Sequence, residues 1–476
     1  MNAAGDARRR WWALVVLCLG VLMIVLDTTI VNVALPSIRT DLGFTETSLV
    51  WVVNAYMLTF GGFLLLGGRL GDLYGHRRLF LIGIVLFTLA SLGCGLAQSQ
   101  VVLIVARAVQ GLAGAVVSAV ALSLIMNLFT EPAERAKAMG VYGFVCAGGG
   151  SIGVLLGGLL TSELNWHWIF LVNLPIGIAV AGLCLVLLPA SRGQAGQRLD
   201  FGGAVTVTCA LMLAVYAVVN GNEAGWGSAR TLGLLGAAAV LLAAFLFIES
   251  RVAAPLMPLS LFRLRNVATA NVAGVLWAAA MFAWFFISAL YMQLVLQYTP
   301  LQVGLAFLPA NLIMAVMSLG LSAKIVLRYG FRGPLAFGLG LAALGLALFA
   351  RAPADGRFVA DVLPGMVLLG LGAGIAFNPM LLAAMSDVDP ADSGLASGVV
   401  NTSFMMGGAL GLAVLASLAA ARSTGLQAAG ATSAAALNGG YQLAFAVGAL
   451  FALLAAALGA WLMRNAPVGA PAPAHV

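Results

Sequence analysis

The sequence predicts an all-α polytopic membrane protein with fourteen transmembrane helices, arranged as two six-helix bundles plus two inserted helices. Three observations lead to this prediction. Of the 476 residues, 62% are hydrophobic and 8% are charged, which is much more apolar than a soluble domain. The apolar residues gather in fourteen runs, most of them long enough to cross about 30 Å of hydrocarbon as a helix. Short motifs in the first part of the chain also reappear in the last part.

The first run follows RRRWW and begins like a signal peptide. It is too long for one, contains Asp27 and has no small-residue cleavage site before the second run, so we expect it to remain as the first span. We expect the Pro- and Ala-rich end of the chain to be a disordered tail. The runs occupy residues 12–36, 48–68, 79–97, 101–129, 138–160, 168–189, 201–219, 231–248, 268–296, 302–323, 334–350, 359–383, 396–421 and 440–463.

Three short matches relate the two parts of the chain at offsets between 255 and 259 residues, and chance matches would not share one offset. A parallel repeat of six-span units places substrate sites near the membrane midplane, between the halves. The matches are Tyr74-Gly75 with Tyr329-Gly330, QGLAGA from Gln110 with LGLGAG from Leu369, and AMGV from Ala138 with ASGV from Ala396. The expected units are an N-terminal bundle (1–190), two inserted helices with flanking loops (191–266), a C-terminal bundle (267–463) and the tail (464–476).

Basic residues concentrate in alternate connections between the runs. With the N-terminus inside the cell, 17 of the 23 basic residues are cytoplasmic, five are outside and Arg107 lies within a span. This asymmetry predicts a multi-pass protein of the cell membrane with both termini in the cytoplasm. The net charge of +7 then reflects topology and contact with the lipid bilayer, and we expect no nucleic-acid partner. The inner basic residues are Arg8, Arg9, Arg10, Arg69, Arg77, Arg78, Arg135, Lys137, Arg192, Arg198, Arg251, Arg263, Arg265, Lys324, Arg328, Arg332 and Arg464.

Six motifs occur in order along the chain: LDTTIVNVALP, GRLGDLYGHRR, RAVQGLAGAVV, GGGSIGVLLGGLL, WHWIFLVNLPIG and GLASGVVNTSFMMGGALG. Together they resemble those of the major facilitator superfamily, in its fourteen-span drug:proton antiporter branch. The resemblance implies the major facilitator fold and proton-driven export of hydrophobic or amphiphilic small molecules, including antibiotics, by alternating access. It implies no cofactor beyond the proton gradient.

Asp27 lies inside the first run, where an isolated charge is unfavourable by ~2.5 to 3.5 kcal/mol on insertion scales. Arg107, about six residues or ~9 Å from the outer end of the fourth run, lies at a similar depth to Asp27, ~24 Å from the inner end of its own run. Burial favours a neutral carboxyl group, whereas a nearby guanidinium favours the ionised one. We therefore predict that Asp27 binds a proton or a cationic substrate and that Arg107 modulates it. A permanent structural ion pair is the alternative.

Polar and small residues near this pair, together with two polar residues at the end of the aromatic ninth run, are candidates for a substrate cavity. Gln110 and Gly111 follow Arg107 on one helical face. Polar side chains in membrane helices also often serve only to join helices, so this alternative stays open. The candidate cavity residues are Thr28, Asn32, Asn54, Gln110, Gly111, Tyr291 and Gln293.

The loop GRLGDLYGHRR reads on charge alone as a basic inner turn. The family resemblance implies that Asp72 latches the two halves together when the cytoplasmic side is closed. The loop SDVDPADSGLASG contains three acids and no basic residue, so opposite charges can meet across the inner mouth. A symmetric counterpart would pair Glu131 and Glu134 with Lys324, Arg328 and Arg332. The expected gate residues are Arg69, Asp72, Arg77, Arg78, Asp387, Asp389 and Asp392.

Gly149, Gly153 and Gly157 recur every four residues in the fifth run, with Gly158 beside them. Such a stripe of small residues permits close helix packing. The family's antiporter signature has proline after the glycine equivalent to Gly153, whereas this chain has Val154, so the resemblance does not by itself fix antiport over symport.

Other classes of protein fit the sequence poorly. The three His residues are scattered, and no buried carboxylate pair, phosphate-binding loop or metal-ligand spacing is visible, so we expect no catalytic or metal site and no enzyme. The five Cys residues lie in predicted spans without paired spacing. We expect the protein to function as a monomer. The alternative to drug export is a carrier for one endogenous metabolite, lipid or siderophore, or an uptake symporter.

Overall fold

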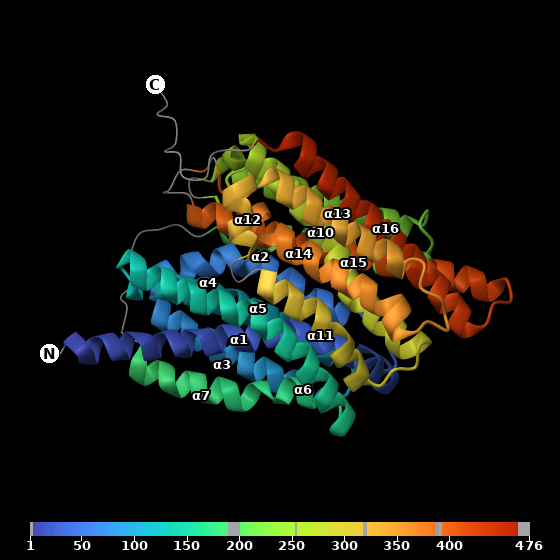
Figure 1. The fold of residues 1–476 in the computed structure, drawn as a ribbon, viewed down its shortest axis with the longest axis horizontal. Helices are drawn as coiled ribbons and strands as arrows, with labels where there is room; N and C mark the ends of the chain where they lie inside the picture. The colour runs from blue at the N-terminus through green and yellow to red at the C-terminus, as the bar shows by residue number, and fades with distance from the viewer. Residues whose placement is uncertain are drawn as a thin grey trace.

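The computed structural model describes residues 3–188, 200–252, 255–317, 321–386, 388 and 393–464. These residues form helices joined by short turns, and no β-strand occurs within the described ranges. Helix α1 begins and helix α16 ends on the same side of the molecule, which we call the termini side (Figure 1). The other side is called the opposite side.

The first bundle contains six spans, the last of which is divided between two helices. Gly75 separates α2 from α3 with a positive φ of 90°, a conformation that glycine adopts without strain. Ser99 starts α4 because its side chain accepts the backbone N–H of Val102. The helices are α1 (Ala3–Leu42), α2 (Val50–Tyr74), α3 (His76–Gly95), α4 (Gln100–Leu128), α5 (Pro132–Glu163), α6 (Trp168–Leu171) and α7 (Asn173–Leu187).

Two inserted helices follow, α8 (Phe201–Ala224) and α9 (Ala229–Arg251), which pack on each other. Helix α8 also packs on α2 and α15, so the pair covers one flank of the molecule where the two bundles meet. Only 17% of the apolar stretch of α9 is buried. Because Val240 and Phe247 are exposed on it, this helix presents an apolar face to lipid.

The second bundle begins after a short 3₁₀ turn, η1 (Leu259–Arg263). Thr299 and Gln302 form a reciprocal capping box at the start of α11. Two spans contain a turn of π-helix, η2 (Tyr291–Val295) and η4 (Phe358–Val362). The helices are α10 (Arg265–Leu290), α11 (Pro300–Val316), α12 (Ser322–Tyr329), α13 (Arg332–Phe349), α14 (Leu363–Ala383), α15 (Ser393–Ala428) and α16 (Ser433–Leu462).

The two bundles pack internally in the same pattern. In the first, α1 packs on α5 and α7, α2 packs on α4, and α3 packs on α4 and α7. In the second, α10 packs on α15 and α16, α11 packs on α14, and α13 packs on α14 and α16. The bundles meet through α2 with α15 and α5 with α11, which are reciprocal pairs of counterparts. This is the arrangement expected of two halves related by a parallel repeat.

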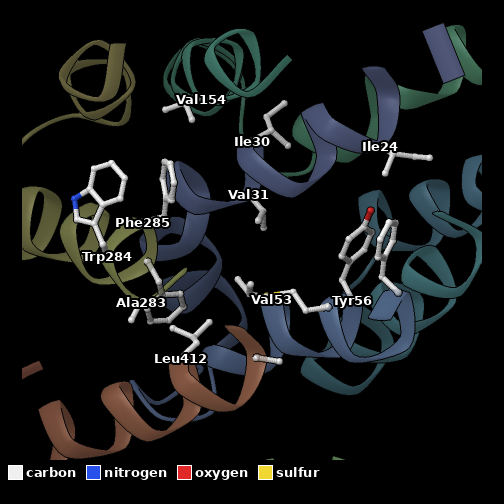
Figure 2. Close-up of a cluster of buried hydrophobic side chains, with 14 of the residues drawn as sticks. Ile24, Ile30, Val31, Val53, Tyr56, Val154, Ala283, Trp284, Phe285 and Leu412 are labelled. Carbon is white, nitrogen blue, oxygen red and sulfur yellow. The ribbon is translucent and has the colours of Figure 1, made fainter. Parts of the chain in front are cut away.

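Apolar side chains fill the contact between the bundles. Figure 2 shows Ile30 and Val31 of α1 and Val154 of α5 near Trp284 and Phe285 of α10. Trp284 is buried and contacts Phe285, with ring centroids 4.4 Å apart and ring planes tilted by 45°. Packing of this kind supplies most of the favourable dispersion contacts between membrane helices.

The predicted fold class is confirmed. Within the described residues, thirteen helices are long and apolar enough to span a membrane. The fourteenth expected span corresponds to α11, a shorter apolar helix that ends just before residues 318–320, which lie outside the described ranges. Of the expected tail, only Arg464 is described.

Candidate functional site

Asp27 of α1 and Arg107 of α4 are in direct contact. Arg107 Nη1 donates to Asp27 Oδ2, and both side chains are almost completely buried. The exposed fraction is 0% for Asp27 and 1% for Arg107. Arg107 also donates through Nε to the carbonyl oxygen of Val52 at 2.9 Å. The two charges inside the spans therefore neutralise each other within the N-terminal bundle.

A polar network from three further side chains surrounds the pair. Gln110 Nε2 donates to Asp27 Oδ1 at 3.0 Å and to Ser91 Oγ at 2.7 Å, while Gln110 Oε1 accepts from Arg107 Nη1 at 2.8 Å. Asn173 Nδ2 donates to Asp27 Oδ1 at 3.1 Å. The network thus connects α1, α3, α4 and α7, and it satisfies both carboxylate oxygens of Asp27.

Aromatic rings complete the surroundings of the guanidinium group. Arg107 Cζ lies 4.5 Å from the centroid of the Tyr56 ring and 5.6 Å from that of Phe170. Cation–π contacts in a desolvated site favour the charged arginine. Sequence reasoning missed Asn173, Ser91 and Tyr56. Asn173 could have been found from the sequence, because it is a polar residue in the largely apolar motif WHWIFLVNLPIG.

Three of the candidate cavity residues have local roles in this conformation. Thr28 donates to the carbonyl oxygen of Val25 at 2.7 Å, and Asn32 donates to that of Thr28 at 3.3 Å, both within α1. A Cβ atom at Gly111 would lie 2.2 Å from the carbonyl oxygen of Tyr56, so this glycine permits close approach of α2 and α4. The close approach at Gly111 fits the helix-joining alternative of the sequence analysis, whereas the bonds of Thr28 and Asn32 stay within α1.

Asn54 and Gln293 instead join the two bundles. Asn54 Nδ2 donates to the carbonyl oxygen of Ala409 at 2.8 Å, and Gln293 Nε2 donates to that of Val33 at 2.8 Å. A third bond runs from the backbone N–H of Leu301 to Ser162 Oγ at 3.1 Å. These bonds lie toward the opposite side of the molecule and hold the bundles together there.

Tyr291 and Trp284 differ in their hydrogen bonding. The Tyr291 hydroxyl donates to the carbonyl oxygen of Pro353 at 2.8 Å, so it joins η2 to a connection of its own bundle. This contact does not support the predicted cavity role of Tyr291.

Trp284 Nε1 is buried without an acceptor among the described residues, in the apolar contact between the bundles (Figure 2). A buried donor without a partner is unfavourable by about 1–3 kcal/mol, so Trp284 is a better candidate for contact with a polar substrate atom.

The expected gate residues are placed only in part. Arg69 donates to the carbonyl oxygen of Pro255 at 3.2 Å, and Arg77 donates to that of Leu185 at 2.6 Å. Arg78 is exposed. The side chain of Asp72 and all of Asp387, Asp389 and Asp392 lie outside the described part of the chain. Glu134, expected in the symmetric counterpart, pairs in this conformation with Arg10 of its own bundle at 3.1 Å.

The glycine stripe of α5 lies against two neighbouring helices. Cβ atoms at Gly153 and Gly157 would lie 3.0 and 2.6 Å from backbone oxygens of α1, and one at Gly149 would lie 2.9 Å from Val25 of α1. A Cβ atom at Gly158 would lie 2.7 Å from the backbone of α11. Val154, where the family has proline, is buried at the contact between the bundles, and α5 is continuous through it.

No group of three or more His, Cys, Asp or Glu residues that could hold a metal ion occurs among the described residues.

The family model of the Major Facilitator Superfamily matches residues 17–412. The chain belongs to the major facilitator superfamily. The match includes the first bundle with Asp27, Arg107 and Asn173, both inserted helices and most of the second bundle.

Curated relatives resemble the chain over most of their length. The puromycin resistance protein pur8 of Streptomyces alboniger is 41% identical over 471 residues, which is 96% of this chain and 92% of that protein. The cephamycin export protein CmcT of Amycolatopsis lactamdurans is 42% identical, covering 85% and 84%. The multidrug resistance protein Stp of Mycobacterium tuberculosis is 38% identical, covering 85% and 74%.

Among solved structures, an auto-inhibited peptide transporter of the POT family superposes with a TM-score of 0.70. It is 16% identical and is covered over 99% of its length by 98% of this chain. At this identity the likeness concerns the fold, and the transported substrate has to be inferred separately.

Proposed function

We propose that this protein is a secondary transporter that exports hydrophobic or amphiphilic small molecules, antibiotics among them, in exchange for protons. Support for export comes from relatives whose names specify resistance to, or export of, antibiotics. Proton coupling rests on one observation, the buried contact of Asp27 with Arg107. We further propose that the termini side faces the cytoplasm and that the functional unit is a monomer.

The geometry supports a simple coupling step. An ionised Asp27 attracts Arg107 and tightens α1 against α4, because opposite charges attract strongly in a low dielectric. A proton on Asp27 removes that attraction and leaves Arg107 its bonds to Val52 and Gln110. The conformation that contains the ion pair therefore favours release of the proton, and a conformation that separates the pair favours its uptake.

The same conformation is held closed on the opposite side by the bonds of Asn54, Gln293 and Leu301. In the proposed orientation this is the outer face. The contact between Asp27 and Arg107 is then formed while the outer face is closed, the state in which an exporter accepts its substrate from the cytoplasm. Outward opening would break these bonds and expose Asp27 to protons from outside, as alternating access requires.

Removing two of these bonds should favour opening of the outer face. A double variant, Asn54→Leu with Gln293→Leu, loses two buried hydrogen bonds of about 0.5–1.5 kcal/mol each. The ratio of open to closed molecules should rise about 5- to 150-fold. Spin labels in the connections 43–49 and 429–432, on opposite bundles, would report this as a larger population at long distance.

The matched control for this experiment is Gln442→Leu. Gln442 donates to the carbonyl oxygen of Ala352 at 2.9 Å within the C-terminal bundle, so its loss leaves the contact between the bundles unchanged. An identical distance distribution for the double variant and the unmodified protein would exclude the bonds of Asn54 and Gln293 from the proposed gate.

Export is tested by expressing the protein in a drug-sensitive bacterial host. We expect resistance to several hydrophobic antibiotics, with lower cellular accumulation that is restored when an uncoupler removes the proton gradient. Resistance to a single compound would instead favour a dedicated exporter, the alternative suggested by relatives named for puromycin or cephamycin alone. Greater accumulation in cells that express the protein would indicate an uptake symporter and would overturn the proposal.

A further inference from the structure

A second pair of acidic side chains is buried at the termini side of the inserted helices. Asp200 caps the start of α8, where its Oδ1 accepts the backbone N–H of Gly203 at 2.7 Å. Glu249 lies near the end of α9, and its Oε2 accepts the backbone N–H of Met257 at 3.0 Å. The exposed fractions of Asp200 and Glu249 are 6% and 4%. Sequence analysis found no buried carboxylate pair because these two residues belong to different helices.

The remaining oxygen of each carboxyl group points toward the other group. Asp200 Oδ2 and Glu249 Oε1 are both buried without a hydrogen-bond partner among the described residues. They lie 2.5 and 2.7 Å from the point where a Cβ atom of Gly203 would be, so both oxygens border the same small space. Glycine at position 203 leaves the space in which the two oxygens converge.

Described basic groups of the neighbouring elements interact elsewhere. Arg69 of α2 donates to the carbonyl oxygen of Pro255, and the Arg251 guanidinium of α9 lies 5.2 Å from the centroid of the Phe247 ring. Arg265 of α10 donates to the carbonyl oxygen of Leu462 at 2.6 Å.

Two more basic residues on neighbouring elements are placed away from the pair. Arg263 of η1 is exposed, and Arg422 of α15 lies near the far end of that helix, toward the opposite side. No ion pair to Asp200 or Glu249 occurs in the described ranges, and Arg192 and Arg198 fall outside them. Two ionised carboxylates this close repel each other, and no described basic group offsets that repulsion, whereas one proton between them makes a strong hydrogen bond.

We propose that Asp200 and Glu249 share one bound proton and form a second proton site, separate from Asp27. The site also contacts the linker between the inserted helices and the C-terminal bundle. Met257 of this linker donates to Glu249 and lines an apolar cavity of about 320 Å³ between α2, α8, α9 and α15. Pro255 of the same linker accepts from Arg69 of the N-terminal bundle. Loss of the shared proton would leave two like charges side by side, and their repulsion would push the end of α9 away from the start of α8.

The sign of the pH effect follows from the bound proton. The folded pair retains a proton that the two separate carboxyl groups of the unfolded chain release, so stability is highest at low pH and falls as pH rises. In lipid nanodiscs, the unmodified protein should lose thermal stability as pH rises, until the pair has released its shared proton. Glu249→Gln carries a neutral amide that can donate to Asp200 at every pH. It should keep its stability at high pH and flatten this dependence.

Two further variants make the comparison specific. Asp200→Asn is the reciprocal change and keeps a residue that caps helices well, so it should flatten the profile in the same way. Glu163→Gln removes an exposed carboxyl group of α5 and should leave the pH profile unchanged.

Infrared difference spectra of the unmodified protein between low and high pH should contain the carbonyl band of a protonated carboxyl group, and Glu249→Gln should lack that band.

Two results would overturn the proposal. The first is an unchanged pH profile in both variants, with no such infrared band in the unmodified protein. Each of the two variants can assign the band to this pair where the other folds poorly, because the proposed proton site at Asp27 can add a band of its own to the spectrum of the unmodified protein. The second is stabilisation by sodium chloride over choline chloride that Glu249→Gln abolishes, because the pair would then bind a metal cation in place of a proton.

Discussion

Asp27→Asn is expected to abolish transport driven by a pH gradient while substrate exchange without a gradient continues. Asparagine keeps the size of the side chain and can accept from Gln110 and Asn173, but it cannot gain or lose a proton at the site. In proteoliposomes with an imposed pH gradient, the driven component should fall by at least about 100-fold, comparable to removal of an essential acid–base group. Counterflow of labelled substrate at equal pH should remain within a few-fold of the unmodified rate.

The matched control is Asp41→Asn in the same helix. Asp41 lies near the end of α1 and accepts the indole N–H of Trp166 at 2.9 Å, far from the network around Arg107. This variant should retain driven transport. Full gradient-driven transport by Asp27→Asn, with unchanged pH dependence, would leave the ion pair with only a structural role.

Arg107→Gln is expected to have the largest effect on stability. Removing the guanidinium group leaves Asp27 buried without a counter-charge, which typically lowers the free energy of unfolding by about 3–5 kcal/mol. The double variant Asp27→Asn with Arg107→Gln removes both charges and should recover most of that loss. Denaturation in mixed detergent micelles would measure all three variants.

The double variant also separates stability from coupling. We expect it to be stable and yet unable to use a pH gradient, because no carboxyl group remains at the network. If the effects of the two single changes on stability simply add, and the double variant shows no recovery, then Asp27 and Arg107 do not interact energetically.

The fold was predictable because the membrane imposes few solutions. Every backbone polar group in hydrocarbon must be bonded within its own helix, so runs such as 101–129 and 440–463 correspond directly to α4 and α16. The repeat matches at Gln110 and Leu369 anticipated the counterparts α4 and α14. Local features were harder to predict, because the hydropathy of the sixth span does not indicate that it is split into α6 and α7.

The candidate site was predictable where charge was the signal. Asp27 and Arg107 are conspicuous because ions are rare inside spans, and their similar depth identified them as partners. Neutral members of the network were harder to find. Ser91 and Tyr56 resemble many other polar residues in membrane helices, and only the packing of α2, α3 and α4 brings them to the ion pair.

Pairings between elements could not be read from charge patterns. Glu134 had several basic candidates and pairs with Arg10, because α1 packs on α5 within one bundle. Gln293 looked like a cavity residue, yet its amide reaches the backbone of α1 and joins the bundles. In both cases the partner depends on helix packing, which the order of residues along one helix does not determine.

The most direct test of the central claim is substrate-induced proton release by the purified protein. A weakly buffered detergent solution with a pH-sensitive dye reports protons that leave the protein when a transported antibiotic is added. If substrate binding favours the conformation in which Arg107 contacts Asp27, the unmodified protein should release a proton and Asp27→Asn should release none. Equal release by both proteins would contradict a coupling role for Asp27.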